Sequence, residues 1–142
     1  MKSLYPVIYW DASAVLSFLT TDAHHDIAKE YYGREGVHLL SSLSYAEALA
    51  VLARLKRQGL LHNEQFDQAC RLLASHPWRL AKIDPEREEI GRLAARWPLR
   101  GADLWHLSFA IALKREFPEL IFLTFDQKLR TAAEGEGLAR QQ

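Results

Sequence analysis

The stretch Val7-Ile8-Tyr9-Trp10-Asp11 decides how the rest of this sequence is interpreted. Four apolar residues in a row are typical of a strand buried in a parallel sheet, and this run ends on a carboxylate. A second apolar run, residues 120–125, ends in the same way on Asp126. In open parallel sheets, ligands bind at the carboxyl ends of the strands. We therefore expect Asp11 and Asp126 to lie at one site.

Two further carboxylates, Glu47 and Asp103, fall on the apolar sides of predicted helices. An ionised carboxylate in apolar surroundings is costly unless a cation or hydrogen bonds compensate it. Each one alone has an ordinary explanation: Glu47 could form a salt bridge, and the aspartates could cap helices. Capping does not explain Glu47, however, so the four together favour one shared cation site. Carboxylates, with the hydroxyls of Ser13 and Thr124 nearby, are the oxygen ligands that Mg²⁺ and Mn²⁺ prefer.

Strand-like runs alternate with helical patterns along the whole chain, which predicts a mostly parallel sheet covered by helices on both faces. We expect a single α/β domain over residues 1–142, a three-layer α/β/α sandwich with four to five central strands. The strands are predicted at residues 7–10, 37–40, 79–83 and 120–125. The helices are predicted at residues 12–19, 24–32, from the serines at 41–44 to Gly59, from a cap at Asn63 to about 75, from a cap at Asp84 with Pro85 at the first helical position to Pro98, 102–114 and 128–134.

The composition is that of an ordinary globular protein. It excludes some functions but does not indicate one by itself. Of the 142 residues, 49% are apolar and 25% charged, and eighteen basic side chains balance eighteen acidic ones. No global charge therefore attracts nucleic acid, so a polyanion must be held by a local basic patch or through metal ions. The single Cys70 excludes an internal disulfide and a cysteine-based zinc site. The sequence shows neither a signal peptide at its start nor an apolar run of membrane-spanning length, so we expect a cytoplasmic protein.

The ordered set of motifs resembles the PIN domain, a family of metal-dependent nucleases, and its size and layout resemble the VapC toxins of bacterial toxin–antitoxin pairs. The matching pieces are Tyr9-Trp10-Asp11-Ala12-Ser13-Ala14-Val15-Leu16, Ser44-Tyr45-Ala46-Glu47, Leu99-Arg100-Gly101-Ala102-Asp103-Leu104-Trp105-His106-Leu107 and Phe122-Leu123-Thr124-Phe125-Asp126. The resemblance implies an endoribonuclease that holds one or two Mg²⁺ or Mn²⁺ ions with Asp11, Glu47, Asp103 and Asp126. It also implies that Ser13 and Thr124 support the site by hydrogen bonds, that a VapB-like antitoxin binds the protein, and that the protein forms a homodimer.

Arg100, beside Gly101 and close to Asp103, is a better candidate for a phosphate contact than the cluster of Arg54, Lys56 and Arg57. His106 either orients the site or packs as a polar helix residue. Two other classes of protein remain open. One is an aspartyl-phosphate protein, either a phosphatase, which would need a second acid where Ser13 stands, or a receiver, which would need an acidic pair that this sequence lacks. The remaining alternative is a non-catalytic module that keeps the fold only to bind a partner.

Overall fold

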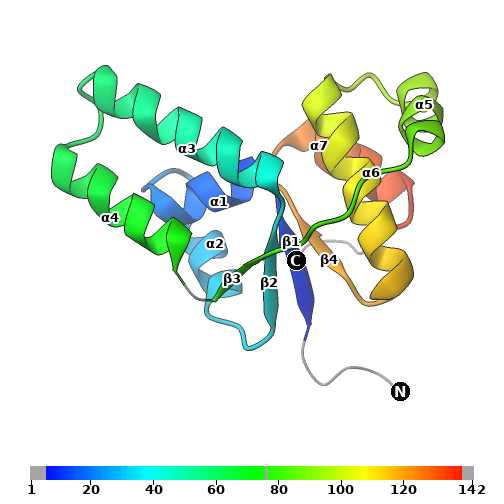
Figure 1. Cartoon of the computed structure of the whole chain (residues 1–142), viewed down its shortest axis with the longest axis horizontal. Helices are drawn as coiled ribbons and strands as arrows, with labels where there is room; N and C mark the ends of the chain where they lie inside the picture. The colour runs from blue at the N-terminus through cyan, green and yellow to red at the C-terminus, as the bar shows by residue number, and fades with distance from the viewer. Residues whose placement is uncertain (1–5, 76, 139–142) are drawn as a thin grey trace.

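The computed structural model describes residues 6–75 and 77–138, and strands alternate with one or two helices throughout (Figure 1). The elements, in chain order, are β1 (Val7–Trp10), α1 (Ala12–Leu19), α2 (His25–Tyr32), β2 (Val37–Leu40), α3 (Ser42–Arg57), α4 (Asn63–Ala74), β3 (Trp78–Leu80), α5 (Arg87–Arg96), α6 (Gly101–Glu116), β4 (Ile121–Leu123) and α7 (Gln127–Gly135). The prediction that the chain starts without a signal peptide concerns residues 1–5 in part, and these lie outside the described residues.

The four strands form one parallel sheet in the order β3-β2-β1-β4, so β1 lies in its interior. Trp10, the last residue of β1, pairs with Leu123, the last residue of β4. The backbone N–H of Asp11 continues this pairing by donating to the Leu123 carbonyl at 3.2 Å. The residues that follow β1 and β4 therefore leave the sheet side by side, as the sequence predicted.

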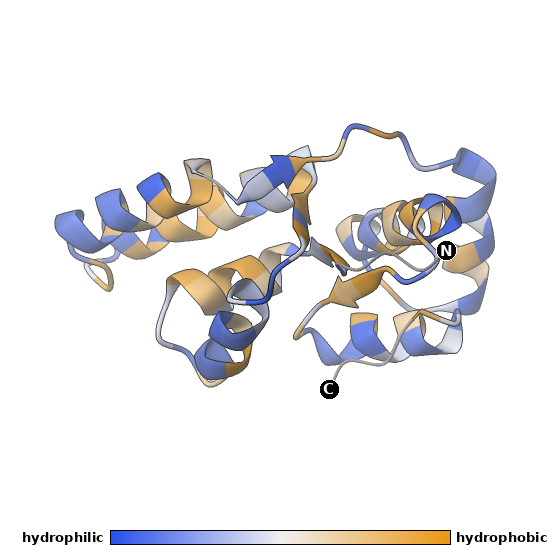
Figure 2. Cartoon of the chain, turned by 90° about the horizontal axis from the view of Figure 1, so that it is seen from below, coloured by the Kyte–Doolittle hydropathy of each residue, from blue (hydrophilic) through white to orange (hydrophobic). Residues whose placement is uncertain are grey.

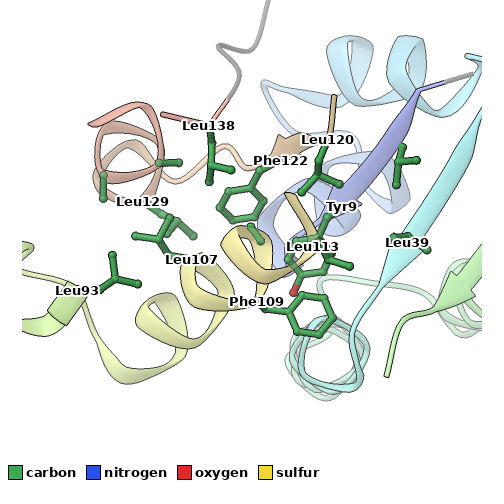
Figure 3. Packing of buried hydrophobic residues seen from close by; sticks show 14 residues of the cluster. Tyr9, Leu39, Leu93, Leu107, Phe109, Leu113, Leu120, Phe122, Leu129 and Leu138 are labelled. Carbon is green, nitrogen blue, oxygen red and sulfur yellow. The ribbon is translucent and has the colours of Figure 1, made fainter. Parts of the chain in front are cut away.

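Two hydrophobic clusters, one on each face of the sheet, make the fold a three-layer sandwich. Alternate strand residues point to opposite faces: Tyr9 and Phe122 pack with α5, α6 and α7 (Figure 3), whereas Ile8 and Leu123 pack with α1 to α4. Figure 2 shows that the helices carry hydrophobic residues toward their neighbours and hydrophilic residues on the outside. In the described part of the chain no helix is long and apolar enough to cross a membrane.

Two strands are shorter than the apolar runs that predicted them. Instead of residues 79–83, β3 spans Trp78–Leu80, because it is an edge strand whose length is set by pairing with β2 alone. The apolar residues beyond it, Ala81 and Ile83, pack against the α6 side of the core. The last strand stops at Leu123 rather than at residue 125, and the Thr124 side chain beyond it bonds Asp11.

The starts of α4 and α5 also differ from the predicted ones. His62, not Asn63, is the N-cap of α4, and its backbone N–H donates to Gln65 Oε1 at 2.8 Å. Helix α5 begins at Arg87, two residues after the predicted start at Pro85. The chain stays extended up to that point because it crosses from edge strand β3 to the helices on the other side of the sheet (Figure 1).

Candidate active site

Asp11 lies at the bottom of the candidate site, directly after β1, and is only 3% exposed. Its carboxylate accepts three hydrogen bonds: from Thr124 Oγ1 at 2.5 Å, from Ser13 Oγ at 2.7 Å, and from the Ala14 N–H at 2.9 Å. The last of these caps α1. Burial raises the pKa of Asp11, while the hydrogen bonds lower it. Three hydrogen-bond donors thus hold both oxygens of a carboxylate that is buried away from water.

Asp126 lies three residues after the end of β4 and is joined to Asp11 through Thr124. Its Oδ1 accepts a backbone N–H in the first turn of α7, which it caps. Its own N–H donates to Thr124 Oγ1 at 3.2 Å. A parallel link runs from the Phe125 N–H to Ser13 Oγ at 3.0 Å. The two hydroxyls therefore tie the β1 and β4 ends into one rigid unit.

Glu47 reaches the site from α3 and is held by a histidine of α6. Glu47 Oε1 lies 2.6 Å from His106 Nε2, and the His106 Nδ1 lies 2.7 Å from the Tyr9 hydroxyl. Tyr9 and His106 are buried, whereas 35% of the Glu47 side chain is exposed. Burial strongly raises the pKa of the Tyr9 phenol. Of the two roles that the sequence left open for His106, the geometry favours orientation of the site.

Asp103, in the first turn of α6, is the carboxylate on which the charges of the other three act. The N-terminus of this helix has no side-chain cap, so capping does not account for Asp103. Burial raises the pKa of Asp103, and the charges of Asp126, Asp11 and Glu47 raise it further, with His106 opposing them. All four carboxylates are thus within electrostatic reach of one another.

Within the described residues, the one basic side chain that pairs with this cluster is His106, which contacts Glu47. In the described residues, no lysine or arginine forms a salt bridge with any of the four carboxylates. With the side chains as they stand, no group of three or more His, Cys, Asp or Glu residues in the same ranges is close enough to hold a metal ion. Carboxylate and hydroxyl oxygens nevertheless form the donor set that suits Mg²⁺ or Mn²⁺.

A cavity of about 430 Å³ opens beside Asp103 and Asp126. Arg100 and Lys128 line it from the starts of α6 and α7, and both are exposed. The sequence predicted a role for Arg100 but gave Lys128 none in this site. The position of Lys128, two residues after Asp126 and in the first turn of α7, was the sequence signal that could have placed it in the site. The basic residues 54–57 lie instead at the far end of α3 (Figure 1), away from this cavity.

Comparison with known proteins agrees with this architecture. The model of the PIN domain family matches residues 8–135, and the chain belongs to that family. Two curated relatives, ribonucleases VapC45 and VapC49 from two strains of Mycobacterium tuberculosis, are each 32% identical over 137 residues, covering 93% of this chain and 92% of the relative. Within the PIN family, the chain is therefore a ribonuclease of the VapC toxin group.

Solved structures show the same fold at lower sequence identity. The crystal structure of Mycobacterium tuberculosis VapC20, described as a toxin that cleaves the sarcin–ricin loop, superposes with a TM-score of 0.62 at 17% identity, covering 95% of this chain and 98% of that one. PAE2754 from Pyrobaculum aerophilum gives a TM-score of 0.60 at 21% identity, covering 93% and 88%. At these identities the likeness concerns the fold alone.

Proposed function

We propose that this ribonuclease cuts RNA internally with Mg²⁺ or Mn²⁺ held by Asp11, Glu47, Asp103 and Asp126. The observation that carries the proposal is the gathering of four carboxylates that form no salt bridge with a lysine or arginine of the described residues. Burial raises the pKa of Asp103 most, and the charges of the other three carboxylates raise it further. A hard divalent cation compensates such a cluster with the ligands it prefers. When bound, the ion supplies Lewis-acid chemistry that activates water and offsets charge on the phosphate oxygens.

The remaining residues of the site have positioning roles in this proposal. Ser13 and Thr124 hold the Asp11 carboxylate in one orientation. Arg100 and Lys128 flank the cavity next to two of the carboxylates, where their charges suit RNA phosphates on either side of the cleaved bond. Because the net charge of the chain is zero, these local contacts and the cation together supply the attraction for RNA.

The test compares Asp103→Asn with Asp67→Asn, a matched change on the exposed surface of α4. Calorimetry with Mn²⁺ and cleavage of labelled RNA by the pure proteins give independent measurements. We expect Asp103→Asn to lose cleavage and bind Mn²⁺ at least tenfold more weakly, while Asp67→Asn behaves as wild type. Undiminished Mn²⁺ affinity in Asp103→Asn would remove Asp103 from the metal site.

The biological part of the proposal is a growth-inhibiting toxin controlled by a VapB-like antitoxin. Expression of the wild-type chain alone in a bacterial host should slow growth, and Asp11→Ala should remove the effect at equal soluble protein level. Equal growth with both proteins would count against toxicity by RNA cleavage.

We further propose that the antitoxin places an arginine among the carboxylates, because a guanidinium compensates carboxylates with paired hydrogen bonds. Added Mn²⁺ and loss of charge at Glu47 or Asp126 should then weaken the complex. An inhibitor bound elsewhere would be insensitive to both.

Three simpler expectations belong to the same proposal. Residues 1–142 act as a single domain, since the four strands of the described chain share one sheet. The protein forms a homodimer, which light scattering of the purified chain would test. It works in the cytoplasm, where its RNA substrate is found, and fractionation of cells that express it would test this location.

A further inference from the structure

A chain of buried polar groups lies beneath Glu47 and joins three elements that are distant in sequence. It runs from the serines at the start of α3 to Tyr9 on β1, then to His106 on α6, and back to Glu47 on α3. Tyr9 Oη lies 2.8 Å from Ser41 Oγ and 2.7 Å from His106 Nδ1, and His106 Nε2 lies 2.6 Å from Glu47 Oε1. Tyr9 is 0% and His106 2% exposed, so water does not compete for these groups.

The partners of each group determine the direction of the hydrogen bonds. An ionised Glu47 can only accept, so His106 Nε2 carries a proton and donates it. In the neutral imidazole the other nitrogen, Nδ1, is then an acceptor, and the Tyr9 hydroxyl donates to it.

The same reasoning extends to the serines. Ser44 Oγ donates to the Trp10 carbonyl at 2.9 Å, so the hydroxyl proton that remains for Tyr9 Oη is that of Ser41. The chain Ser41 to Tyr9 to His106 to Glu47 thus has one consistent direction, in which each of these protons has an acceptor.

This arrangement fixes one oxygen of Glu47 and spares the other. Among the described residues, Oε2 has no hydrogen-bond partner, in contrast to both oxygens of Asp11. A free glutamate samples many rotamers, and a bond to a buried, immobile donor removes that freedom. Groups that orient a ligand in this way commonly change metal affinity tenfold to a hundredfold when they are removed.

We propose that Tyr9 and His106 are positioning residues that hold Glu47 ready to ligate the cation through Oε2. Tyr9 acts through His106, because its hydroxyl donates to Nδ1 and so reinforces the Nε2–H tautomer that Glu47 already favours. The inference rests on the proposed metal site, yet the tautomer that it requires exists without metal and can be measured in the metal-free protein.

The first experiment uses Tyr9→Phe, which keeps the ring against Phe109 and Phe122 but removes the hydroxyl. Tyr32→Phe is the control, since it makes the same change on α2. Nitrogen NMR of the metal-free proteins, well above the ordinary histidine pKa of about 6.5, reports the His106 tautomer. We expect the Nε2–H form in wild type and in the control, and a smaller share of that form in Tyr9→Phe, where Glu47 still favours it but the Tyr9 hydroxyl no longer does. A Nδ1–H form in wild type, or an unchanged tautomer in Tyr9→Phe, would overturn the proposal.

The second experiment measures Mn²⁺ affinity by calorimetry. Tyr9→Phe should bind about tenfold more weakly than wild type, and His106→Leu more weakly still. His106→Gln should recover part of the loss, because its amide can again donate to Glu47. Equal affinities in wild type, Tyr9→Phe and His106→Leu would refute positioning. If wild type itself binds no Mn²⁺, the proposed metal site fails, and the tautomer measurement still decides whether the polar chain has the assigned direction.

Discussion

Thr124→Val tests whether the hydroxyls around Asp11 carry the energy that their geometry indicates. The change is nearly isosteric and affects a fully buried residue, so the packing of the side chain is kept. It removes the 2.5 Å bond to Asp11 Oδ2 and leaves the Asp126 N–H without its 3.2 Å acceptor. The variant therefore isolates hydrogen bonding from volume.

The expected loss can be worked from these two bonds. A hydrogen bond to a charged group contributes about 1.5–3 kcal/mol, and leaving the half-buried Asp126 N–H without a partner costs about 1 kcal/mol, the low end for a buried group. Protonation of Asp11 offsets part of this, because burial already raises the pKa of that carboxyl. We expect the free energy of unfolding to fall by roughly 2–4 kcal/mol, which lowers Tm by about 6–12 °C in a chain of this length.

The assay is thermal unfolding in chelator, followed by Mn²⁺ calorimetry of the same samples. Thr131→Val, on the exposed surface of α7, should change stability by less than about 0.5 kcal/mol. Because Ser13 Oγ also donates to Asp11 and lies 3.3 Å from Thr124 Oγ1, losses in Ser13→Ala and Thr124→Val should not add. If Thr124→Val unfolds within 1 °C of wild type and binds Mn²⁺ equally well, the reasoning about Asp11 is refuted.

Four further substitutions test other parts of the structure. Asp103→Asn should raise the Tm of the metal-free protein, increasingly so as pH rises, because burial and the like charges of the other site carboxylates raise the pKa of that group; a lower Tm would contradict this. Burial lowers the pKa of His38, so the unfolded chain takes up a proton first and stability should fall as pH drops below about 6.5; His38→Gln should flatten that dependence in pH-resolved melts. Gly135→Ala places a methyl group against the Trp97 ring and should cost about 1–3 kcal/mol, whereas Gly91→Ala enters open space on α5 and should stabilise by up to about 1 kcal/mol in urea titration.

The sequence predicted those parts of the fold that local chemistry decides. The runs at 7–10 and 37–40 are strands over the full predicted length, because both strands are buried within the sheet. Strand β3 could not be delimited in this way, because its pairing with β2 decides where it ends, and Ala81 and Ile83 are apolar for another reason. Apolar runs therefore locate strands well in the sheet interior and less well at its edge.

The candidate site was predictable in its carboxylates but not in what surrounds them. Asp11 and Asp126 follow strands, and strand ends meet, so their proximity is visible in the sequence. The bond between Glu47 and His106 joins residues 59 positions apart on two helices. No local pattern encodes that contact, because it depends on how α3 and α6 pack.

Asp11 and Asp126 each begin a helix as well as facing the candidate site. This double role shapes the mutations by which a host cell could escape a toxic chain. Substitutions at these two positions by residues that cannot cap remove activity and also cost about 0.5–2 kcal/mol of stability. A substitution at Asp103, which caps nothing, removes charge from the site without this cost. We therefore expect inactive variants that keep full stability to be found at Asp103 more often than at the two capping positions.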